Sequence, residues 1–265
     1  MRTMRIFLLL MCLFSIQGKS QLLNQWIIEA STGTSSYNGD LVEGSMPLKR
    51  MGSFIGADIK HLISQKFCWR AGMSYGRIFG NDKKNKDPEL YQRNLSFKSH
   101  IIELNFGAEY ELRSLDDYYY TPYFYAGLGV FHFNPYTFDD NKNKVFLQPL
   151  GTEGQGLKDY PDRKKYGLFQ VTLPVGGGVK FNIAENLVLN YEFMYHFIFT
   201  DYLDDVSKTY VPMDKLSPET AALSFRQQGV NFALRVGERR GDKKNRDVYY
   251  YNVIKLSKFI NYRSL

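Results

Sequence analysis

The stretch IIELNFGAEYEL, residues 101–112, alternates between two kinds of side chain. Even-numbered positions such as Phe106 are apolar or aromatic, whereas three odd-numbered positions, Glu103, Glu109 and Glu111, carry carboxylates. Because successive side chains of a β-strand point to opposite faces, this period of two predicts a strand with one apolar and one charged face. A catalytic pair of acids, a solvated sheet and the wall of a barrel would each explain such a strand.

The same alternation recurs along the chain and predicts eight strands. In each of them one face is apolar or aromatic, and the opposite face is small, polar or charged. The composition agrees, because the 20 Tyr and 20 Phe residues favour half-buried pleated surfaces, and Tyr also suits a membrane interface. The predicted strands are residues 26–37, 53–63, 67–79, 100–113, 121–134, 168–182, 187–200 and 247–259.

The connections between these strands alternate in length. Residues 64–66, 114–120 and 183–186 are short connections, and the long ones are polar, as in NDKKNKDPE at 81–89. Outer-membrane barrels show this pattern, with tight turns on the periplasmic side and extended loops outside. The sequence therefore predicts an all-β fold, an eight-stranded antiparallel transmembrane (outer-membrane) β-barrel with short periplasmic turns and long extracellular loops.

Two further segments bear on the number of strands. Residues 230–236 also alternate, but a ninth strand would place the two termini on opposite sides, and bacterial single-chain barrels have even strand numbers. We therefore assign residues 226–238 to the last outer loop and residues 247–259 to the closing strand. A ten-stranded barrel with a further strand near residues 145–147 is the alternative.

The first residues have the pattern of a secretory signal peptide. Arg2 and Arg5 precede an apolar run at 6–14, which is too short to span a bilayer as a helix, and small residues follow it. We expect a signal peptide over residues 1–20 and one outer-membrane β-barrel domain over residues 21–265. Removal of the signal peptide lowers the formal net charge from +7 to +4 and leaves a single cysteine, so no disulfide framework is expected.

The polar faces of the strands predict a charged lumen. If the apolar faces lie against lipid, the polar faces line the interior. An eight-stranded barrel is just wide enough for side chains to fill, so near-balanced charges there are expected to pair and to plug it against bulk transport. The predicted lumen residues are six acids and five bases: Glu29, Asp58, Lys60, Arg70, Glu103, Glu109, Glu111, Arg113, Lys180, Glu192 and Lys255.

Motifs for catalysis are weak. Glu109 and Glu111 share a face, but they are expected low in a packed lumen rather than beside a substrate cleft. An enzymatic barrel would need a histidine and a nucleophile at its outer rim, and His132, His196 and Ser207 form no recognisable arrangement. We therefore expect no enzymatic activity.

The outer loops contain further candidate sites. Asp201, Asp204 and Asp205 are suited to calcium by residue type, but their spacing matches no EF-hand, and no metal or cofactor is expected. Residues 240–242 spell Arg-Gly-Asp, an adhesion tripeptide that also arises by chance. Nucleic acid is not an expected partner of an exported barrel with a charge of +4. Basic clusters that suit either anionic lipid headgroups or simple solvation are Lys83, Lys84 and Lys86, residues 163–165 and residues 239–246.

Several segments together resemble one family. They are YNGDL (37–41), GVFHFNP (129–135), LGTEGQG (150–156), LPVGGGVKF (173–181), FTDYLDDVS (199–207) and the Arg-Gly-Asp segment before Asp247. In this order they resemble a family of small outer-membrane barrels that includes PorG, a component of the type IX secretion system. The resemblance implies an integral outer-membrane protein that associates with the periplasmic ring of that machine, a lipoprotein and its partner, and anchors it.

Two functions are therefore open. As a component of the type IX secretion system, the barrel would meet outer-membrane lipid, dock its periplasmic turns on the ring proteins and contact the translocon through its outer loops. As a generic small outer-membrane barrel, it would serve surface binding or envelope integrity through those loops. The predicted docking residues are Ser64, Gln65, Lys66, Leu115, Asp116, Asp117, Tyr118, Ala184, Glu185 and Asn186.

Overall fold

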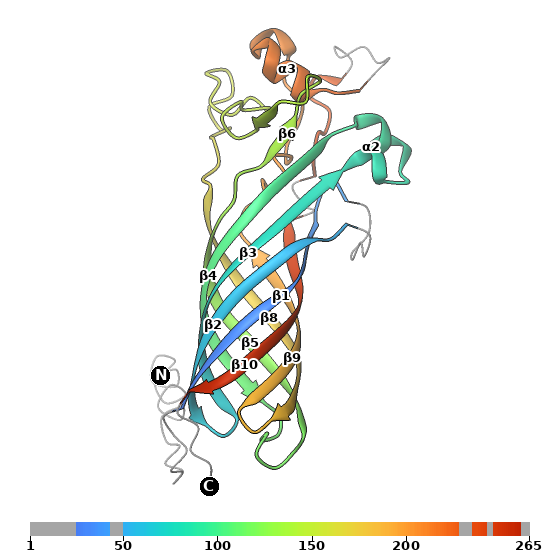
Figure 1. Cartoon of the computed structure of the whole chain (residues 1–265). Coiled ribbons are helices and arrows are strands. Elements are labelled where there is room, and N and C mark those ends of the chain that lie inside the picture. Colours follow the sequence, from blue (N-terminus) through green and yellow to red (C-terminus); the bar gives the residue numbers. More distant parts are fainter. Residues whose placement is uncertain (1–24, 43–49, 228–234, 243–245, 261–265) are drawn as a thin grey trace, which may run out of the picture.

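The computed structural model describes residues 25–42, 50–227, 235–242 and 246–260. Within these ranges, eight antiparallel strands close into a barrel, as the sequence predicts (Figure 1). The neighbour order around the wall is β3, β2, β1, β10, β9, β8, β5 and β4, and β4 pairs again with β3. The wall strands are β1 Trp26–Asn38, β2 Gly52–Ser64, β3 Phe67–Asn81, β4 Ser96–Glu111, β5 Tyr120–His132, β8 Phe169–Ala184, β9 Leu187–Ile198 and β10 Val248–Ile260.

The two ends of the barrel differ in their connections. The hairpins β2–β3, β4–β5 and β8–β9 turn at the end where Trp26 pairs with Ile260, which we call the turn end (Figure 1). Register shifts between Leu62 and Ser64 and between Asn182 and Ala184 mark bulges that tighten two of these turns. The long connections all emerge at the opposite, loop end. The predicted signal peptide, residues 1–20, and residues 228–234 of the last outer loop lie outside the described ranges.

The loops contain short elements of their own. Strands β6 Tyr136–Phe138 and β7 Lys144–Phe146 form a hairpin, and among the described residues it joins the sheet only through the pair Lys98 and Tyr136. Residues near 145–147 are thus extended, but they add no strand to the wall, and the ten-stranded alternative is wrong. The helical elements are η2 Asp82–Lys84, α2 Pro88–Arg93, η3 Met213–Lys215 and α3 Pro218–Ser224.

The short α-helices begin where capping residues allow. Asp87 accepts a hydrogen bond from the Glu89 amide, and Ser217 accepts one from the Thr220 amide, with a proline in the first turn of each helix. In the part of the chain that the structure describes, no helix is long and apolar enough to cross a membrane.

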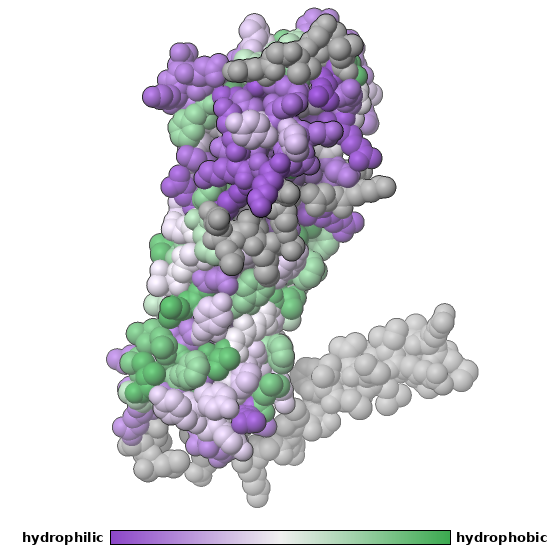
Figure 2. All heavy atoms as spheres, turned by 90° about the vertical axis from the view of Figure 1, so that its right-hand side faces the viewer, coloured by the Kyte–Doolittle hydropathy of each residue, from purple (hydrophilic) through white to green (hydrophobic). Residues whose placement is uncertain are grey.

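The outer surface of the wall is apolar in its lower and middle parts. In β4 the even-numbered residues point outward and the acids point inward: Leu104 is 61% exposed, whereas Glu103 and Glu109 are buried. Figure 2 shows apolar side chains over the wall and mainly hydrophilic ones over the loop end. A closed barrel pairs its backbone groups within the wall and presents this surface to lipid.

One substitution tests the lipid-facing assignment. Leu104 lies in mid-strand, paired with Met73 and Val130, so Leu104→Arg places a charge well inside the lipid and is expected to cost about 2–4 kcal/mol. Phe169→Arg, at the first residue of β8 and equally exposed to the outside, is expected to cost at most about 1 kcal/mol. Urea titration of refolded protein in detergent or lipid measures both, and equal costs would contradict the assignment.

The interior is layered along the barrel axis. Charged residues fill the part nearest the turn end, and a buried aromatic cluster that includes Phe97, Phe131, Tyr249 and Tyr251 fills the part above it. Polar loop residues cover this cluster at the loop end. The lower and upper polar layers are the two candidate functional regions.

Candidate functional site

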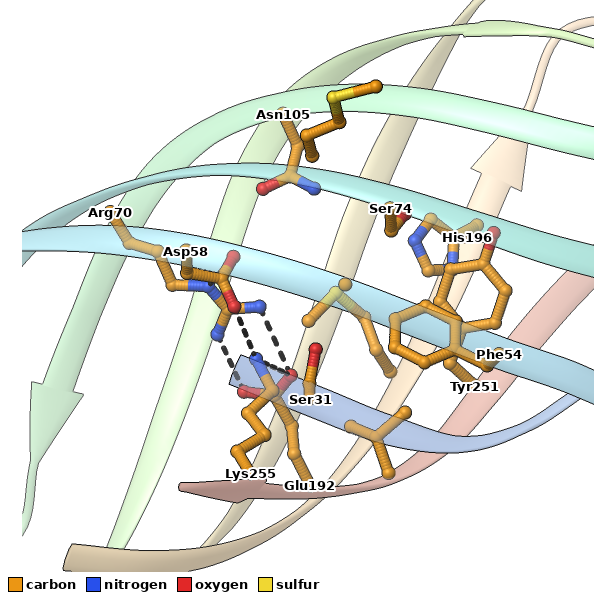
Figure 3. Close-up of a pocket in the computed structure, with 14 residues that line it drawn as sticks. Ser31, Phe54, Asp58, Arg70, Ser74, Asn105, Glu192, His196, Tyr251 and Lys255 are labelled. Carbon is orange, nitrogen blue, oxygen red and sulfur yellow. Dashed lines mark hydrogen bonds and ion pairs between the residues drawn. The ribbon is translucent and has the colours of Figure 1, made fainter. Parts of the chain in front are cut away.

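Arg70 is the centre of the lower layer. Its guanidinium donates two hydrogen bonds to Glu192, from Nη1 at 2.6 Å and from Nη2 at 3.1 Å, and one from Nε to Asp58 Oδ1 at 3.1 Å. Figure 3 shows these side chains turned toward one another from β3, β9 and β2. Strands that are not neighbours are thus tied across the lumen.

Three lysines complete the layer. Lys255 lies within 2.9–3.1 Å of carboxylate oxygens of Glu29, Asp58 and Glu192. Lys60 bridges Glu29 at 2.8 Å and Glu109 at 3.0 Å. Lys180 contacts Glu109 and lies 2.5 Å from Glu111 Oε1. The structure therefore joins nine predicted residues, which we call the lumen network: Glu29, Asp58, Lys60, Arg70, Glu109, Glu111, Lys180, Glu192 and Lys255.

Two predicted lumen residues lie outside the lumen network. Arg113 is exposed in the β4–β5 turn, with its guanidinium 5.1 Å from the centre of the Tyr118 ring, so its assignment to the lumen is wrong. The reason is that β4 ends at Glu111. Beyond the end of a strand, the alternation no longer predicts which face a side chain lies on. Glu103 is buried in the lumen but higher up, where it contacts His196 Nε2 at 3.2 Å and accepts a hydrogen bond from the Tyr249 hydroxyl at 2.8 Å.

The network leaves little open space. Its members are at most 8% exposed, and a cavity between the network and the aromatic cluster has a volume of about 20 Å³, the size of about one water molecule. Polar residues that were not predicted also contribute, because Asn190 and Ser257 both donate hydrogen bonds to Glu29. The arrangement can hold the wall strands together, and its side chains fill this part of the lumen.

The residues considered for catalysis are separated. His132 lies on the outer surface of β5 against the Phe169 ring, whereas His196 points into the lumen beside Glu103. Ser207 lies in the β9–β10 connection, where its hydroxyl donates to Asp201. Glu109 and Glu111 are both occupied by Lys180.

The upper polar layer begins at Tyr37, the last but one residue of β1. The Tyr37 hydroxyl donates to Asp204 Oδ2 at 2.5 Å and lies 3.1 Å from Asp247 Oδ1. Asp247 also accepts the Leu203 amide, and Asp204 accepts the Val206 amide. Because the hydroxyl has one proton, the second contact is a hydrogen bond only if Asp247 carries a proton and donates it.

Glu153 and Arg240 form the second half of this layer. Arg240 donates to Glu153 Oε1 at 3.2 Å and to the carbonyl of Asp205 at 2.6 Å, and Glu153 also accepts the amides of Ser207 and Lys208. The LGTEGQG segment reaches this position through glycines at 151, 154 and 156, all with positive φ values that favour glycine.

The β3–β4 loop is attached to the same layer. Arg93 pairs with Asp82 and donates to the carbonyls of Arg240 at 2.6 Å and of Asp40 at 2.7 Å. Thr152 and Tyr166 both donate to Asp205. We call the following buried or largely buried residues the cap: Tyr37, Asp82, Arg93, Thr152, Glu153, Tyr166, Asp204, Asp205, Arg240 and Asp247.

The cap contains two of the loop motifs. Arg240 of the Arg-Gly-Asp tripeptide is 2% exposed and fully engaged, so the tripeptide is not presented to solvent as an adhesion motif. The carboxylates of Asp204 and Asp205 accept hydrogen bonds from side chains and amides. Among the residues that the structure describes, no group of three or more His, Cys, Asp or Glu is arranged to hold a metal ion.

Four carboxyl groups in or beside the cap have raised pKa values. Burial, followed by the negative charge of Asp40, raises the pKa of Asp204 well above its usual range, and burial with the charge of Asp204 does the same for Asp247. Burial raises the pKa of Asp205 and of Asp201 to about 6. A carboxyl with a raised pKa binds more protons in the folded state than in the unfolded state, where its pKa is about 3.9.

The cap is therefore expected to become more stable as the pH falls from about 7 through 6. Each such carboxyl contributes up to about tenfold in the opening equilibrium per pH unit between its unfolded and folded pKa. Hydrogen exchange of the Val206 and Leu203 amides, corrected for the intrinsic pH dependence, measures the effect. Asp205→Asn should flatten part of the profile, and faster opening at lower pH would contradict the assignment.

The predicted docking residues lie together at the turn end. Ser64 and Ala184 end their strands, and the other eight lie in the three turns between β2 and β3, β4 and β5, and β8 and β9. The longest turn is organised by Ser114, whose carbonyl accepts the amides of Asp117 and Tyr118. Three short turns thus form one surface at the turn end.

The chain matches one family model. A family model described as "Domain of unknown function (DUF6089)" matches residues 4–216. No curated protein sequence matches the chain. Neisserial surface protein A is 12% identical with a TM-score of 0.44, and the match covers 88% of this chain and 96% of that one.

Two other solved structures are similar. A major outer membrane protein from Thermus thermophilus is 12% identical with a TM-score of 0.45, covering 89% of this chain and 99% of that one. The outer membrane enzyme PagL is 12% identical with a TM-score of 0.31, covering 87% and 97%. At these identities the likeness is one of fold alone.

Proposed function

We propose that this chain, which belongs to the family described as Domain of unknown function (DUF6089), is a small outer-membrane β-barrel for surface binding or envelope integrity. The observation that carries the proposal is the contrast between its two polar layers. The lumen network closes the barrel to solutes, and the cap fixes long loops in one arrangement at the loop end.

An ordered cap favours binding. Loops that are already fixed lose little conformational entropy when a partner binds, so the same contacts give a higher affinity. The cap joins residues from the β1–β2, β3–β4, β5–β8 and β9–β10 connections, as Arg93 and Arg240 show by their contacts. The exposed parts of these loops form the binding surface in this proposal, with the extracellular space on their side of the membrane.

Complementation of a deletion strain tests the proposal. Removal of residues 139–146 deletes β7 and the turn before it and leaves the eight wall strands in place. It is expected to reduce cell adhesion to immobilised glycan and protein surfaces or to increase entry of a hydrophobic dye. The amount of heat-resistant barrel on a gel is the control for folding. Full complementation in both assays at normal barrel levels would contradict the proposal.

A second candidate is a structural role in the type IX secretion system, anchoring the periplasmic ring. One observation favours it: four of the six segments that carry the resemblance to the family that includes PorG meet in the cap, namely YNGDL, LGTEGQG, FTDYLDDVS and the Arg-Gly-Asp segment. YNGDL contacts FTDYLDDVS through Tyr37 and Asp204, and LGTEGQG contacts it through Thr152 and Asp205. The resemblance thus concerns one connected structure rather than scattered matches.

The two candidates differ in which end of the barrel matters. Replacement of residues 115–119 in the longest turn is expected to abolish secretion if the turns dock on the ring, and ring proteins should co-purify with the tagged wild-type chain in mild detergent. Unchanged secretion at normal barrel levels would reject the secretion role while leaving the surface role intact.

A further inference from the structure

A basic and aromatic pocket lies on the outer surface of the barrel, where β2, β3, β4 and the β6 hairpin meet. Its volume is about 660 Å³, within the range of ligand-binding pockets. The lining that matters here comprises three bases and three aromatic rings: Arg77, Lys84, Lys98, Phe79, Tyr136 and Phe138. The pocket is separate from the lumen network and from the cap.

The bases of this pocket have no acidic partners. In the described ranges, no Asp or Glu forms an ion pair with Arg77, Lys84 or Lys98, and no acid is among the lining residues. The buried Nε of Arg77 makes no hydrogen bond to another described residue. A pocket with several positive charges and an unused donor is complementary to an anion.

The aromatic rings hold the bases in place. Lys98 Nζ lies 4.8 Å from the centre of the Phe138 ring, and Lys84 Nζ lies 5.7 Å from that of Phe79. A further base, Lys144, borders the pocket with its Nζ 4.0 Å from the Tyr136 ring centre. Cation–π contacts of this kind leave the ammonium protons available to a ligand.

The position of the pocket relative to lipid points to the ligand. On β4 the outward-facing residues are apolar up to Ile102 and basic at Lys98. These residues are four apart, or roughly 10 Å along the membrane normal for a strand tilted by about 40°. On β3 the same change occurs between Met73 and Arg77. The bases therefore lie just beyond the hydrocarbon edge, at the level of the headgroups on the loop side.

We propose that this pocket binds the phosphorylated sugar headgroup of an outer-leaflet glycolipid, that is, lipopolysaccharide. Arg77, Lys84 and Lys98 would contact the phosphates, and Tyr136 and Phe138 would cover the sugar rings. The acyl chains would lie on the apolar wall directly below the pocket. A soluble anion has no acyl chains and would make no contact with this part of the wall. Basic pockets at this depth are suited to anionic headgroups.

The experiment compares two double variants of the full chain in detergent and in nanodiscs. Arg77→Ala with Lys98→Ala removes two pocket charges, and Lys158→Ala with Lys164→Ala removes two exposed charges from the β5–β8 connection. Binding of purified lipopolysaccharide is measured by titration and by native mass spectrometry. We expect roughly 30-fold weaker binding for the pocket variant and little change for the control, at about 1 kcal/mol per charge.

Further arms identify the source of the anion. Dephosphorylated lipopolysaccharide should bind the wild type as weakly as intact lipopolysaccharide binds the pocket variant, and inorganic phosphate at equal concentration should not compete. Heat-dependent gel mobility shows that each variant is folded. Equal weakening in both double variants, unchanged binding after dephosphorylation, or full competition by phosphate would each overturn the proposal.

Discussion

Replacing Arg70 by alanine is expected to destabilise the barrel by about 3–5 kcal/mol. Arg70 is 2% exposed and contacts Asp58, Glu109 and Glu192. Its removal leaves these carboxylates buried with fewer cations, and a buried charge without sufficient compensation is far more costly than a lost contact.

Two further variants test whether the loss of stability comes from the position of Arg70 in the network rather than from the loss of any arginine. Arg113→Ala removes an exposed arginine from the β4–β5 turn and is expected to change the free energy of unfolding by less than about 1 kcal/mol. Arg70→Lys keeps the charge but loses the paired hydrogen bonds to Glu192, so an intermediate cost is expected. Urea titration in detergent and heat-dependent gel mobility measure all three. An Arg70→Ala protein as stable as Arg113→Ala would show that the network contributes little.

The inward face of the wall could be predicted well because the period of two is a strict geometric consequence of the strand. Parity alone assigns Glu29, Lys60 and Lys255 to the lumen, and the structure brings Glu29 into contact with both lysines. The same reasoning fails where a strand ends. Arg113 has the parity of Glu111, but it lies in the turn, where side-chain direction is no longer set by the pleat.

Contacts across the lumen could not be predicted. His196 has the inward parity of Glu192, yet its partner Glu103 lies on β4, which is separated from β9 by β5 and β8. Parity gives the face of a strand and says nothing about its height relative to a strand that is not a neighbour. That height depends on the stagger of every strand pair between them.

The cap was missed for a different reason. Polar loops rich in Asp, Asn and Lys were expected to be solvated, and composition cannot distinguish a solvated carboxylate from one that is buried with its partners. Asp204 and Glu153 are both buried because hydroxyls, amides and Arg240 satisfy them. The available signal was the set of motifs at 37–41, 150–156 and 199–207, which the structure brings together.

Replacing Arg240 by alanine is expected to open the cap while leaving the wall intact. The side chain is 2% exposed and connects Glu153, the Asp205 carbonyl and the Ser224 carbonyl, so its loss leaves Glu153 without its cation. The local cost is about 3–5 kcal/mol. The amides of Ser207 and Lys208 donate hydrogen bonds to Glu153, and this cost corresponds to at least 100-fold faster hydrogen exchange at both.

Arg239→Ala is the matched control, because the Arg239 side chain is 73% exposed and pairs only with Asp242 among the described residues. It should leave exchange and loop proteolysis at wild-type levels. Neither variant should change the heat-dependent gel mobility, since the eight wall strands pair without the cap. Equal exchange in the two variants would mean that the loops are held by their aromatic contacts, such as Tyr166 on Tyr202, rather than by the Arg240 cluster. Loss of the gel shift in Arg240→Ala alone would instead make the cap a requirement for closing the barrel.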